Sequence, residues 1–287
     1  MLPTESYPFP ARRPGFPAHS NEKIFCINRL VCVATVDDGD LSRCSRGCPR
    51  AVADVELLIL MNGKNNLEPF ALQNWGQIAN AGSTDEVAIA VEFGRIGDLD
   101  EPRSWGGVKR FFVEKGMTPD AANAVQDPAQ LVRNADMGDF DAFRNFLASG
   151  KQYHPAKHYM VVVWNHGVEW RANRKSSAPM RSLSFDEETQ HTLYNVDVPN
   201  SIQQVFGEEK IDVVGFDACL MANLENAYEL RSRASYLVGS EELEPCAGWD
   251  YGFLGELVKK PAMSGSDLSK AIVAHYANYY TANPSAT

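Results

Sequence analysis

Two side chains that could carry out nucleophilic chemistry follow apolar segments of this sequence. His166 comes shortly after YMVVVW (159–164), and Cys219 comes shortly after IDVVGF (211–216). A cysteine attacks as its thiolate, so it needs a nearby base or cation that lowers its pKa. A histidine can take the thiol proton and later protonate a leaving amine. Together the two residues predict attack on a carbonyl group through a thioester intermediate.

The residues beside this pair suit the same chemistry. Gly167 has no side chain to obstruct a substrate carbonyl, and its N–H and that of Cys219 could both donate to an oxyanion. A helix predicted over 220–230 would begin directly after Cys219, and its N-terminal dipole would help to stabilise a thiolate. A lone buried cysteine is more often structural than reactive, so catalysis requires the histidine and the cysteine to lie at the tips of neighbouring strands.

The apolar segments predict a sheet that could hold these residues. Strands predicted over continuous apolar runs alternate with predicted helices, which indicates an α/β fold with a mainly parallel sheet and helices on both faces. Lys109–Val113 is predicted as a hairpin strand over that sheet. Ligands of such sheets bind beyond the carboxyl ends of the strands. The predicted strands are 55–61, 86–93, 159–164, 211–216 and 236–239, and the predicted helices are 66–80, 139–149, 196–206, 220–230 and 266–280.

Residues 1–53 are predicted to be an extension without regular structure, because prolines recur from Pro3 to Pro17 and no apolar period follows them. Four of the six cysteines lie in this region, at positions 26, 32, 44 and 48. The spacing of the last two fits half of a zinc site, a disulfide or neither. No matching Cys or His pair follows, so we expect no metal site there. The globular domain is expected over 54–287.

Charge and hydropathy argue against two classes of partner. The formal net charge of −10 disfavours nucleic acid, which needs clustered Lys and Arg. No apolar run reaches the roughly 20 residues that span a bilayer, so no membrane partner is expected.

Residues 24–36 are apolar, but Asn28 and Arg29 interrupt them and no basic start lies close to Met1, so they make a poor signal peptide.

Five segments resemble the signature blocks of the clostripain family of cysteine peptidases, relatives of caspases, gingipains and legumain. Three of these segments are WNHG (164–167), GFDACLM (215–221) and GSEELEPCAGWDY (239–251). LMNGKNNLE (60–68) and GSTDEVAIAVEFGR (82–95) resemble the first two strands of the family. In caspases the histidine lies about 50 residues before the cysteine, and here the separation is 53. The resemblance implies a caspase-like α/β/α sandwich.

The resemblance also implies that His166 and Cys219 are the catalytic dyad of an endopeptidase that cleaves after Arg or Lys. It assigns Asp217 to the basic side chain that precedes the cleaved bond. Residues two apart in an extended segment face the same side, so Asp217 and Cys219 would share a cleft. A carboxylate shielded from water binds a cation strongly. The alternative is that Asp217 caps the helix predicted after Cys219.

The block 239–251 is expected to line the same cleft. Glu242, Trp249 and Asp250 are its candidate substrate-binding residues, with Asp250 as a second acid for the basic side chain. Trp249 could equally be a packing residue, which is the commoner role of a buried indole.

Members of the family are made as precursors that cut themselves in the loop after the catalytic histidine. The polar, basic stretch 170–182 suits such processing. Its candidate cleavage sites are Arg171, Arg174, Lys175 and Arg181.

Calcium dependence also occurs in the family. The acidic run Asp186–Glu188 and the pair Asp139 and Asp141 could offer oxygen ligands, although neither follows an EF-hand pattern. Calcium is therefore a possible ligand, and no cofactor is expected to be required for the chemistry.

We expect a monomer that acts on peptides or proteins with a basic residue before the cleaved bond. The alternatives are a catalytically silent binding module with the same fold and a transpeptidase that uses the same dyad. Lys64 stands where the family often has Asp, and Cys246 stands where it often has Gly. Many relatives carry further structure after the last predicted helix, so we expect a domain shortened at its C-terminus. The resemblance implies a secreted or periplasmic protein, but without a clear signal peptide the compartment stays open.

Overall fold

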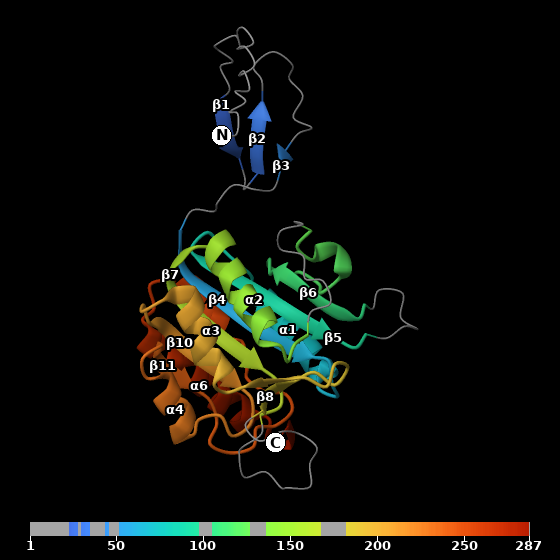
Figure 1. The fold of residues 1–287 in the computed structure, drawn as a ribbon, viewed down its shortest axis with the longest axis vertical. Coiled ribbons are helices and arrows are strands. Elements are labelled where there is room, and N and C mark those ends of the chain that lie inside the picture. Colours follow the sequence, from blue (N-terminus) through green and yellow to red (C-terminus); the bar gives the residue numbers. More distant parts are fainter. Residues whose placement is uncertain are drawn as a thin grey trace, which may run out of the picture. The chain divides into compact units, whose positions relative to one another are not determined.

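The computed structural model describes residues 52–97, 105–126, 136–167 and 182–286, together with three short strands between residues 23 and 45. The chain divides into two compact units, Met1–Cys48 and Pro49–Thr287. The second unit carries the large sheet (Figure 1).

The first unit contains a small antiparallel sheet with the strands in the order β1–β2–β3. β1 spans Lys23–Ile27, β2 spans Leu30–Ala34 and β3 spans Cys44–Ser45. These strands lie in a region where the sequence predicts no regular element. The Ile, Phe and Val residues of KIFCI and LVCVA favour strand pairing, a signal that the neighbouring prolines obscure.

The second unit is built on a sheet of six described strands in the order β11–β10–β7–β4–β5–β6. All neighbours in this sheet pair in parallel except β6, which runs antiparallel to β5 at one edge. The strands are β4 (Ala53–Gly63), β5 (Val87–Arg95), β6 (Gly107–Phe112), β7 (Ala156–Trp164), β10 (Ile211–Asp217) and β11 (Ala234–Val238). The central strands read as continuous apolar runs because both of their faces are buried.

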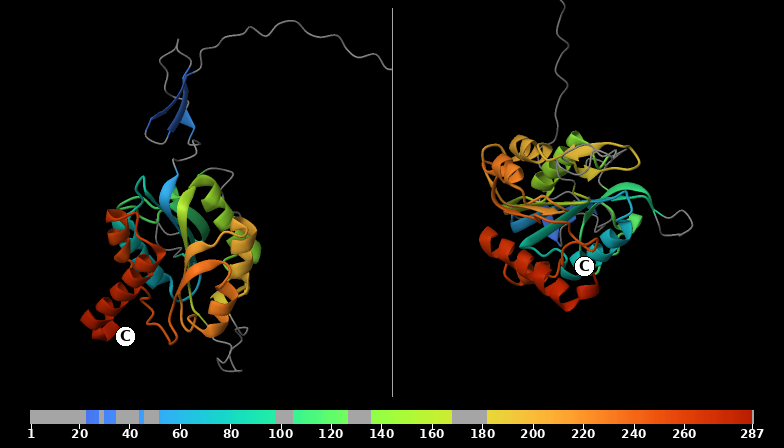
Figure 2. Two further views of the ribbon diagram at one scale, coloured as in Figure 1. Left: turned by 90° about the vertical axis from the view of Figure 1, so that its left-hand side faces the viewer. Right: turned by 90° about the horizontal axis from the view of Figure 1, so that it is seen from below.

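Helices cover both faces of the sheet (Figure 2). α1 (Glu68–Ala81), α5 (Phe253–Lys259) and α6 (Gly265–Ala282) pack on one face, where Leu57 and Ile59 of β4 join their core. α2 (Phe140–Tyr153), α3 (Asp197–Phe206) and α4 (Leu224–Leu230) pack on the other, with Leu58 and Leu60. Because side chains alternate along a strand, one apolar run supplies both cores. The predicted α/β/α sandwich is confirmed.

A short hairpin of β8 (Ser182–Phe185) and β9 (Thr192–Tyr194) lies at the carboxyl end of β7. The N–H of Phe185 donates to Asn165 Oδ1 at 3.2 Å, and the amide of Asn62 donates to Phe185 O at 2.9 Å. The hairpin is thereby fastened to the ends of two central strands. Two single turns of 3₁₀ helix, Ala121–Asn123 and Pro284–Ala286, complete the described elements.

The predicted strands and helices of this unit are confirmed, with three differences. β6 lies in the plane of the sheet as its edge strand, rather than over the sheet as predicted, because it pairs with β5 along its whole length. The helix predicted over 220–230 starts later, at Leu224. α5 and the β8–β9 hairpin were too short to give a periodic signal.

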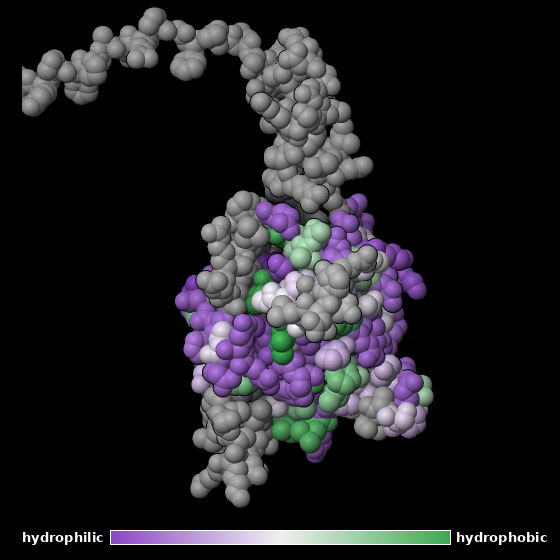
Figure 3. Space-filling model, turned by 90° about the vertical axis from the view of Figure 1, so that its right-hand side faces the viewer, coloured by the Kyte–Doolittle hydropathy of each residue, from purple (hydrophilic) through white to green (hydrophobic). Residues whose placement is uncertain are grey.

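The face over the β5–β6 edge is mainly hydrophilic (Figure 3). Lys109 and Arg110 lie in β6 itself, and charged residues on an edge strand discourage pairing with another chain. Among the described helices, none has both the length and the apolar character that crossing a bilayer requires.

Candidate active site

The ends of β7 and β10 bring His166 and Cys219 to the same edge of the sheet. The two strands pair in parallel, and Trp164 lies opposite Asp217 at the last step of their register. The N–H of Asn165 then donates to the carbonyl oxygen of Asp217 at 3.2 Å. His166 and Cys219 each follow two residues after that last pair, so the two side chains leave neighbouring strands at the same level.

Gly167 packs directly against the backbone of Cys219. A Cβ atom at position 167 would lie 1.9 Å from the carbonyl oxygen of Cys219 and 2.9 Å from its nitrogen. Contacts of Cβ atoms under 3.0 Å essentially never occur, so only glycine allows the two backbones to come this close. The contact joins the loop after His166 to the residue that carries the sulfur.

Asn66 holds the imidazole of His166 from the turn after β4. Its Oδ1 accepts a hydrogen bond from His166 Nε2 at 2.8 Å. With the proton on Nε2, Nδ1 keeps its lone pair. Burial lowers the pKa of His166, and the charge of Glu187 opposes part of this effect. The imidazole is therefore neutral near pH 7 and can accept a proton at Nδ1.

The sulfur of Cys219 is half-buried among backbone N–H groups. The N–H of Glu244 donates to Sγ at 3.2 Å, and the backbone N–H groups of Gly167 and Cys219 lie near enough to favour the thiolate. Burial raises the pKa of the thiol, and the charge of Glu244 raises it further, against the opposing effect of the N–H groups. The resting residue is therefore a thiol, and attack on a substrate requires transfer of its proton to a base.

The segment after Cys219 is a tight turn rather than the start of a helix. Leu220 has a φ of 63°, in the left-handed region that non-glycine residues rarely adopt. α4 begins later and is capped by Asn223, whose side chain accepts from the N–H of Asn226. The predicted help of a helix dipole at the thiolate is therefore wrong, and so is the alternative role of Asp217 as the helix cap.

Asp217 is buried next to a second carboxyl group, that of Glu244. Its Oδ1 accepts from the N–H of Trp249 at 3.1 Å and its Oδ2 from the hydroxyl of Tyr251 at 3.0 Å, while a side-chain hydrogen bond joins it to Glu244. Burial raises the pKa of Asp217 to about 7, and burial together with the charge of Asp217 raises that of Glu244 to about 9. Two carboxyl groups so placed share a proton at neutral pH.

Aromatic side chains surround this acid pair. Trp249 packs on the backbone of β10, where a Cβ on Gly215 would lie 2.7 Å from its ring. Its indole N–H donates to Glu244 Oε1 at 3.4 Å. Burial raises the pKa values of Tyr276 and Tyr280 of α6, and the charges of both carboxyls add to this effect. The weakly polar surroundings strengthen the attraction of the carboxyls for any cation that reaches them.

The block 239–251 wraps around Cys219, but its predicted residues do not all face the acid pair. The side chain of Glu242 is exposed, and its carbonyl oxygen accepts the N–H of Leu220 at 3.1 Å. Asp250 lies 3.1 Å from His275 Nδ1 and also accepts the N–H of Gly252. The second acid beside Asp217 is therefore Glu244 rather than Asp250, because the carboxylate of Asp250 points to α6.

Three polar residues of the site were not among the candidates selected from the sequence. Asn66 and Glu244 lie inside the quoted blocks, but nothing in a single sequence distinguishes them from their polar neighbours. Asn74 of α1 is fully buried, and its Oδ1 accepts from the indole of Trp164 at 2.8 Å while its amide donates to Trp249 O at 3.2 Å. A polar residue on the apolar face of a helix was the available signal for it.

The four candidate cleavage sites lie outside the described residues; they are Arg171, Arg174, Lys175 and Arg181. That part of the prediction remains untested.

The positions considered for calcium do not fit that ion. The carboxylate of Asp186 forms an ion pair with the ammonium of Lys64 at 2.9 Å. Asp139 caps α2, and Asp141 pairs with Arg144 at 2.8 Å. Within the described part of the chain, no three metal-binding side chains come together. A calcium ion would have to displace Lys64 to reach the buried carboxylate.

Comparison with known proteins decides the family. The sequence signature of the clostripain family, peptidase family C11, matches residues 59–286. The chain belongs to the clostripain family. Its resemblance to that family and its caspase-like fold, both expected from the motifs, are thereby confirmed, and the protein is a member of a family of cysteine peptidases.

Individual relatives are distant. The clostripain of Hathewaya histolytica is 26% identical over an alignment 137 residues long, which covers 44% of this chain and 25% of that protein. A secreted C11 cysteine protease from Bacteroides thetaiotaomicron, solved with an irreversible peptide inhibitor, is similar in fold with a TM-score of 0.60 and 21% identity, over 80% of this chain and 59% of that one. An inactive C11 zymogen from Parabacteroides distasonis has a TM-score of 0.54 and 16% identity, over 81% and 60%. The chain thus spans less than two thirds of the length of each of these relatives.

Proposed function

We propose that this clostripain-family protein is a cysteine endopeptidase that cleaves after Arg or Lys, with His166 as the base and Cys219 as the nucleophile. The observation that carries the proposal is the contact of Gly167 with the backbone of Cys219. This contact joins the ends of β7 and β10. The neutral imidazole of His166, held by Asn66, and the thiol of Cys219 therefore lie at the same edge of the sheet.

The residues support a two-step acyl transfer. The thiol proton of Cys219 passes to Nδ1 of His166, and the thiolate attacks the substrate carbonyl. The N–H groups of Gly167 and Cys219, which lie near the sulfur, donate to the oxyanion that forms beside it. The imidazolium gives its proton to the leaving amine as the C–N bond breaks and a thioester remains. His166 then deprotonates a water molecule, whose attack releases the acid and restores the thiol.

The acid pair accounts for the choice of a basic side chain. Without a cation, Asp217 and Glu244 share a proton because two buried negative charges repel one another. A guanidinium or ammonium group supplies the charge that lets both carboxyls ionise. A neutral or acidic side chain at the same position brings no positive charge. The negative charge that Asp217 and Glu244 share would then stay buried without a cation to balance it.

Fluorogenic peptides that differ only in the residue before the cleaved bond test the proposal. We expect turnover with Arg and Lys, none with Asp or Asn, and none by the Cys219→Ala variant. An Asp217→Ala variant should lose the basic preference but keep a Cys219 that reacts with iodoacetamide. Absence of turnover of all four peptides, before and after trypsin treatment that nicks exposed loops, contradicts the peptidase role. Turnover of Asp or Asn peptides alone contradicts the assigned specificity.

Maturation by self-cleavage in 170–182 is part of the same proposal, since the four basic residues of this stretch match the proposed specificity. Purified protein is incubated beside its Cys219→Ala variant, and the products are identified by mass spectrometry. The expected result is cleavage after one of the four basic residues in the unmodified protein alone. Identical band patterns from both proteins would exclude self-cleavage.

A further inference from the structure

The ammonium group of Lys64 is buried between two carboxylates, next to the turn that carries Asn66. Nζ lies 2.9 Å from Asp186 Oδ2 and 2.6 Å from Glu188 Oε2, and the side chains of Lys64 and Asp186 are 3% and 0% exposed. Burial lowers the pKa of the ammonium, but the hydrogen bonds and charges of the two carboxylates outweigh it and the net shift is upward. Removing one partner of such a pair leaves an uncompensated buried charge.

Asp186 joins this ammonium to the β8–β9 hairpin. Its Oδ2 also accepts the N–H of Met137 at 3.0 Å, and its Oδ1 accepts those of Glu188 and Thr189 at 3.0 and 3.1 Å. Burial raises the pKa of Asp186, but Lys64 and the N–H groups lower it by a larger amount, so the net shift is downward. The carboxylate therefore stays ionised and organises the turn between β8 and β9.

The backbone of Lys64 is held as firmly as its side chain. Its N–H donates to Asn62 Oδ1 at 3.0 Å, and its carbonyl oxygen accepts the N–H of Glu187 at 3.3 Å. Asn66 follows two residues later and accepts from His166 Nε2. A displacement of Lys64 therefore moves the turn on which the orientation of the imidazole depends.

We propose that Lys64 is a positioning residue for His166: its buried pairing with Asp186 fixes the turn from which Asn66 holds the imidazole with the proton on Nε2. The expected effect on turnover rests on the proposed peptidase function, whereas the effect on the imidazole does not. The β8–β9 hairpin thereby becomes part of the support of the catalytic base.

The test combines kinetics with ¹⁵N NMR of histidine-labelled protein, in which the His166 signals are assigned with a His166→Ala variant. In Lys64→Met, kcat for an Arg peptide should fall about 10-fold or more, as expected when a reacting group is misplaced, with KM within about twofold. The Nε2–H signal of His166 should weaken or be lost. Lys64→Arg should restore most of both. Asn66→Ala should reproduce the loss, and the Lys64→Met/Asn66→Ala double variant should be no slower than the slower single variant, because both act on one interaction.

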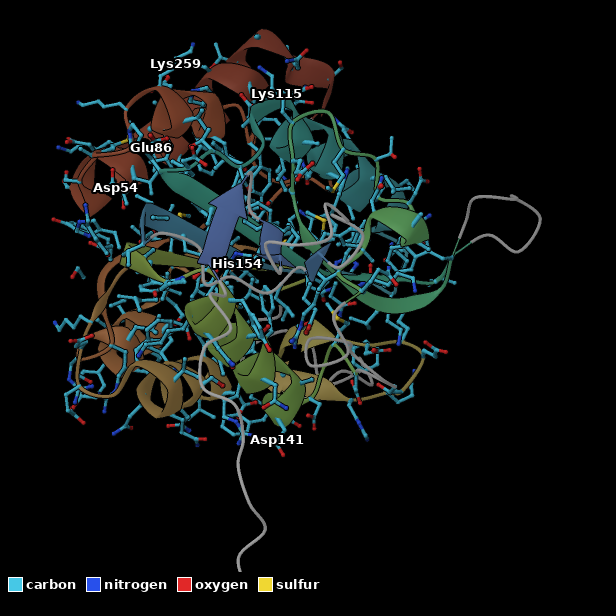
Figure 4. The ribbon with its side chains drawn as sticks, turned by 90° about the horizontal axis from the view of Figure 1, so that it is seen from above. Asp54, Glu86, Lys115, Asp141, His154 and Lys259 are labelled. Atoms are coloured by element: carbon cyan, nitrogen blue, oxygen red, sulfur yellow. The ribbon has the colours of Figure 1, made fainter. Side chains whose placement is uncertain are left out.

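The matched control is Lys157→Met. Lys157 pairs with Asp54 at 2.7 Å near the other end of β4 and β7, where its side chain is 64% exposed; Asp54 is labelled in Figure 4. Exposed pairs contribute little, so kcat and the His166 signals should not change.

A folded Lys64→Met protein with unchanged kcat and an intact Nε2–H signal would overturn the proposal, as would losses that multiply in the double variant. If Lys64→Met does not fold, Lys64→Met/Asp186→Asn removes both buried charges and is read in the same way. If no peptide is turned over by the unmodified protein but the NMR change is found, the peptidase proposal fails and the positioning role stands.

Discussion

Replacing Gly167 by alanine should separate the two halves of the proposed active site. The added Cβ would lie 1.9 Å from the carbonyl oxygen of Cys219, and contacts under 3.0 Å essentially never occur. The two backbones must therefore part by about 1 Å, and a misplacement of that size can cost roughly 100-fold in rate. We expect kcat/KM for an Arg peptide to fall by about that factor, and overpacking to lower the free energy of unfolding by about 1–3 kcal/mol.

Urea unfolding and peptide turnover, measured on the same preparations, separate the two effects. The matched control is Gly76→Ala in α1, because a Cβ on Gly76 would meet no atom within 4 Å. Alanine there should raise the free energy of unfolding by roughly 0.5–1 kcal/mol and leave kcat/KM unchanged. If folded Gly167→Ala keeps kcat/KM within about threefold of the unmodified protein, the close contact does not align the dyad and the reasoning is refuted.

Four further predictions concern individual side chains and the acid pair. Asp217→Asn should lower kcat/KM for Arg peptides about 10- to 100-fold, since a hydrogen bond to a charged group contributes about 1.5–3 kcal/mol; equal rates for Arg and neutral peptides in the unmodified protein would contradict this role. The folded-state pKa values of Asp217 and Glu244 lie above their unfolded values, so the folded state binds more protons, and the free energy of unfolding should fall as pH rises from about 4 through about 7 to about 9. Urea midpoints across that range should decline less in Asp217→Asn. The lowered pKa of His166 predicts that the acidic limb of kcat, measured at saturating Arg peptide with the acid pair occupied, has its midpoint below that of a free histidine, about 6.5; a midpoint above that value would refute it. Leu220→Gly should relieve about 1 kcal/mol of left-handed backbone strain, measured as a higher urea midpoint.

The sheet could be predicted because its central strands are buried on both faces. Strands such as YMVVVW and IDVVGF have no polar alternation to confuse with a helix, and their ends mark where reactive residues can lie. The start of α4 could not be predicted in this way. Leu220 and Met221 are good helix formers, but a hydrogen bond to the carbonyl of Glu242 and the cap at Asn223 shift the start of the helix. Contacts between distant segments decided this boundary.

The site residues likewise divide into those that the sequence could predict and those that packing decides. His166 and Cys219 come two residues after the last pair of β7 and β10, so local pattern and spacing were enough to select them, whereas the role of Asp217 at the end of β10 came from the family resemblance. Glu244 and Asp250 lie in one loop and are both acids, and only the packing of α6 decides which of them meets Asp217. His275 takes the carboxylate of Asp250, which leaves Glu244 beside the buried acid.

The packing of Trp249 on the backbone of β10 gives the protein an internal optical probe. Its ring contacts the strand that leads to Cys219, and its indole N–H lies 3.4 Å from a carboxyl of the acid pair. Indole emission responds to nearby charge, so binding of a cationic inhibitor should change the fluorescence without any label. A Trp249→Phe variant identifies that signal among the five tryptophans of the chain. Occupancy of the site could then be followed in real time, even in a protein whose sulfur has been removed and which turns over nothing.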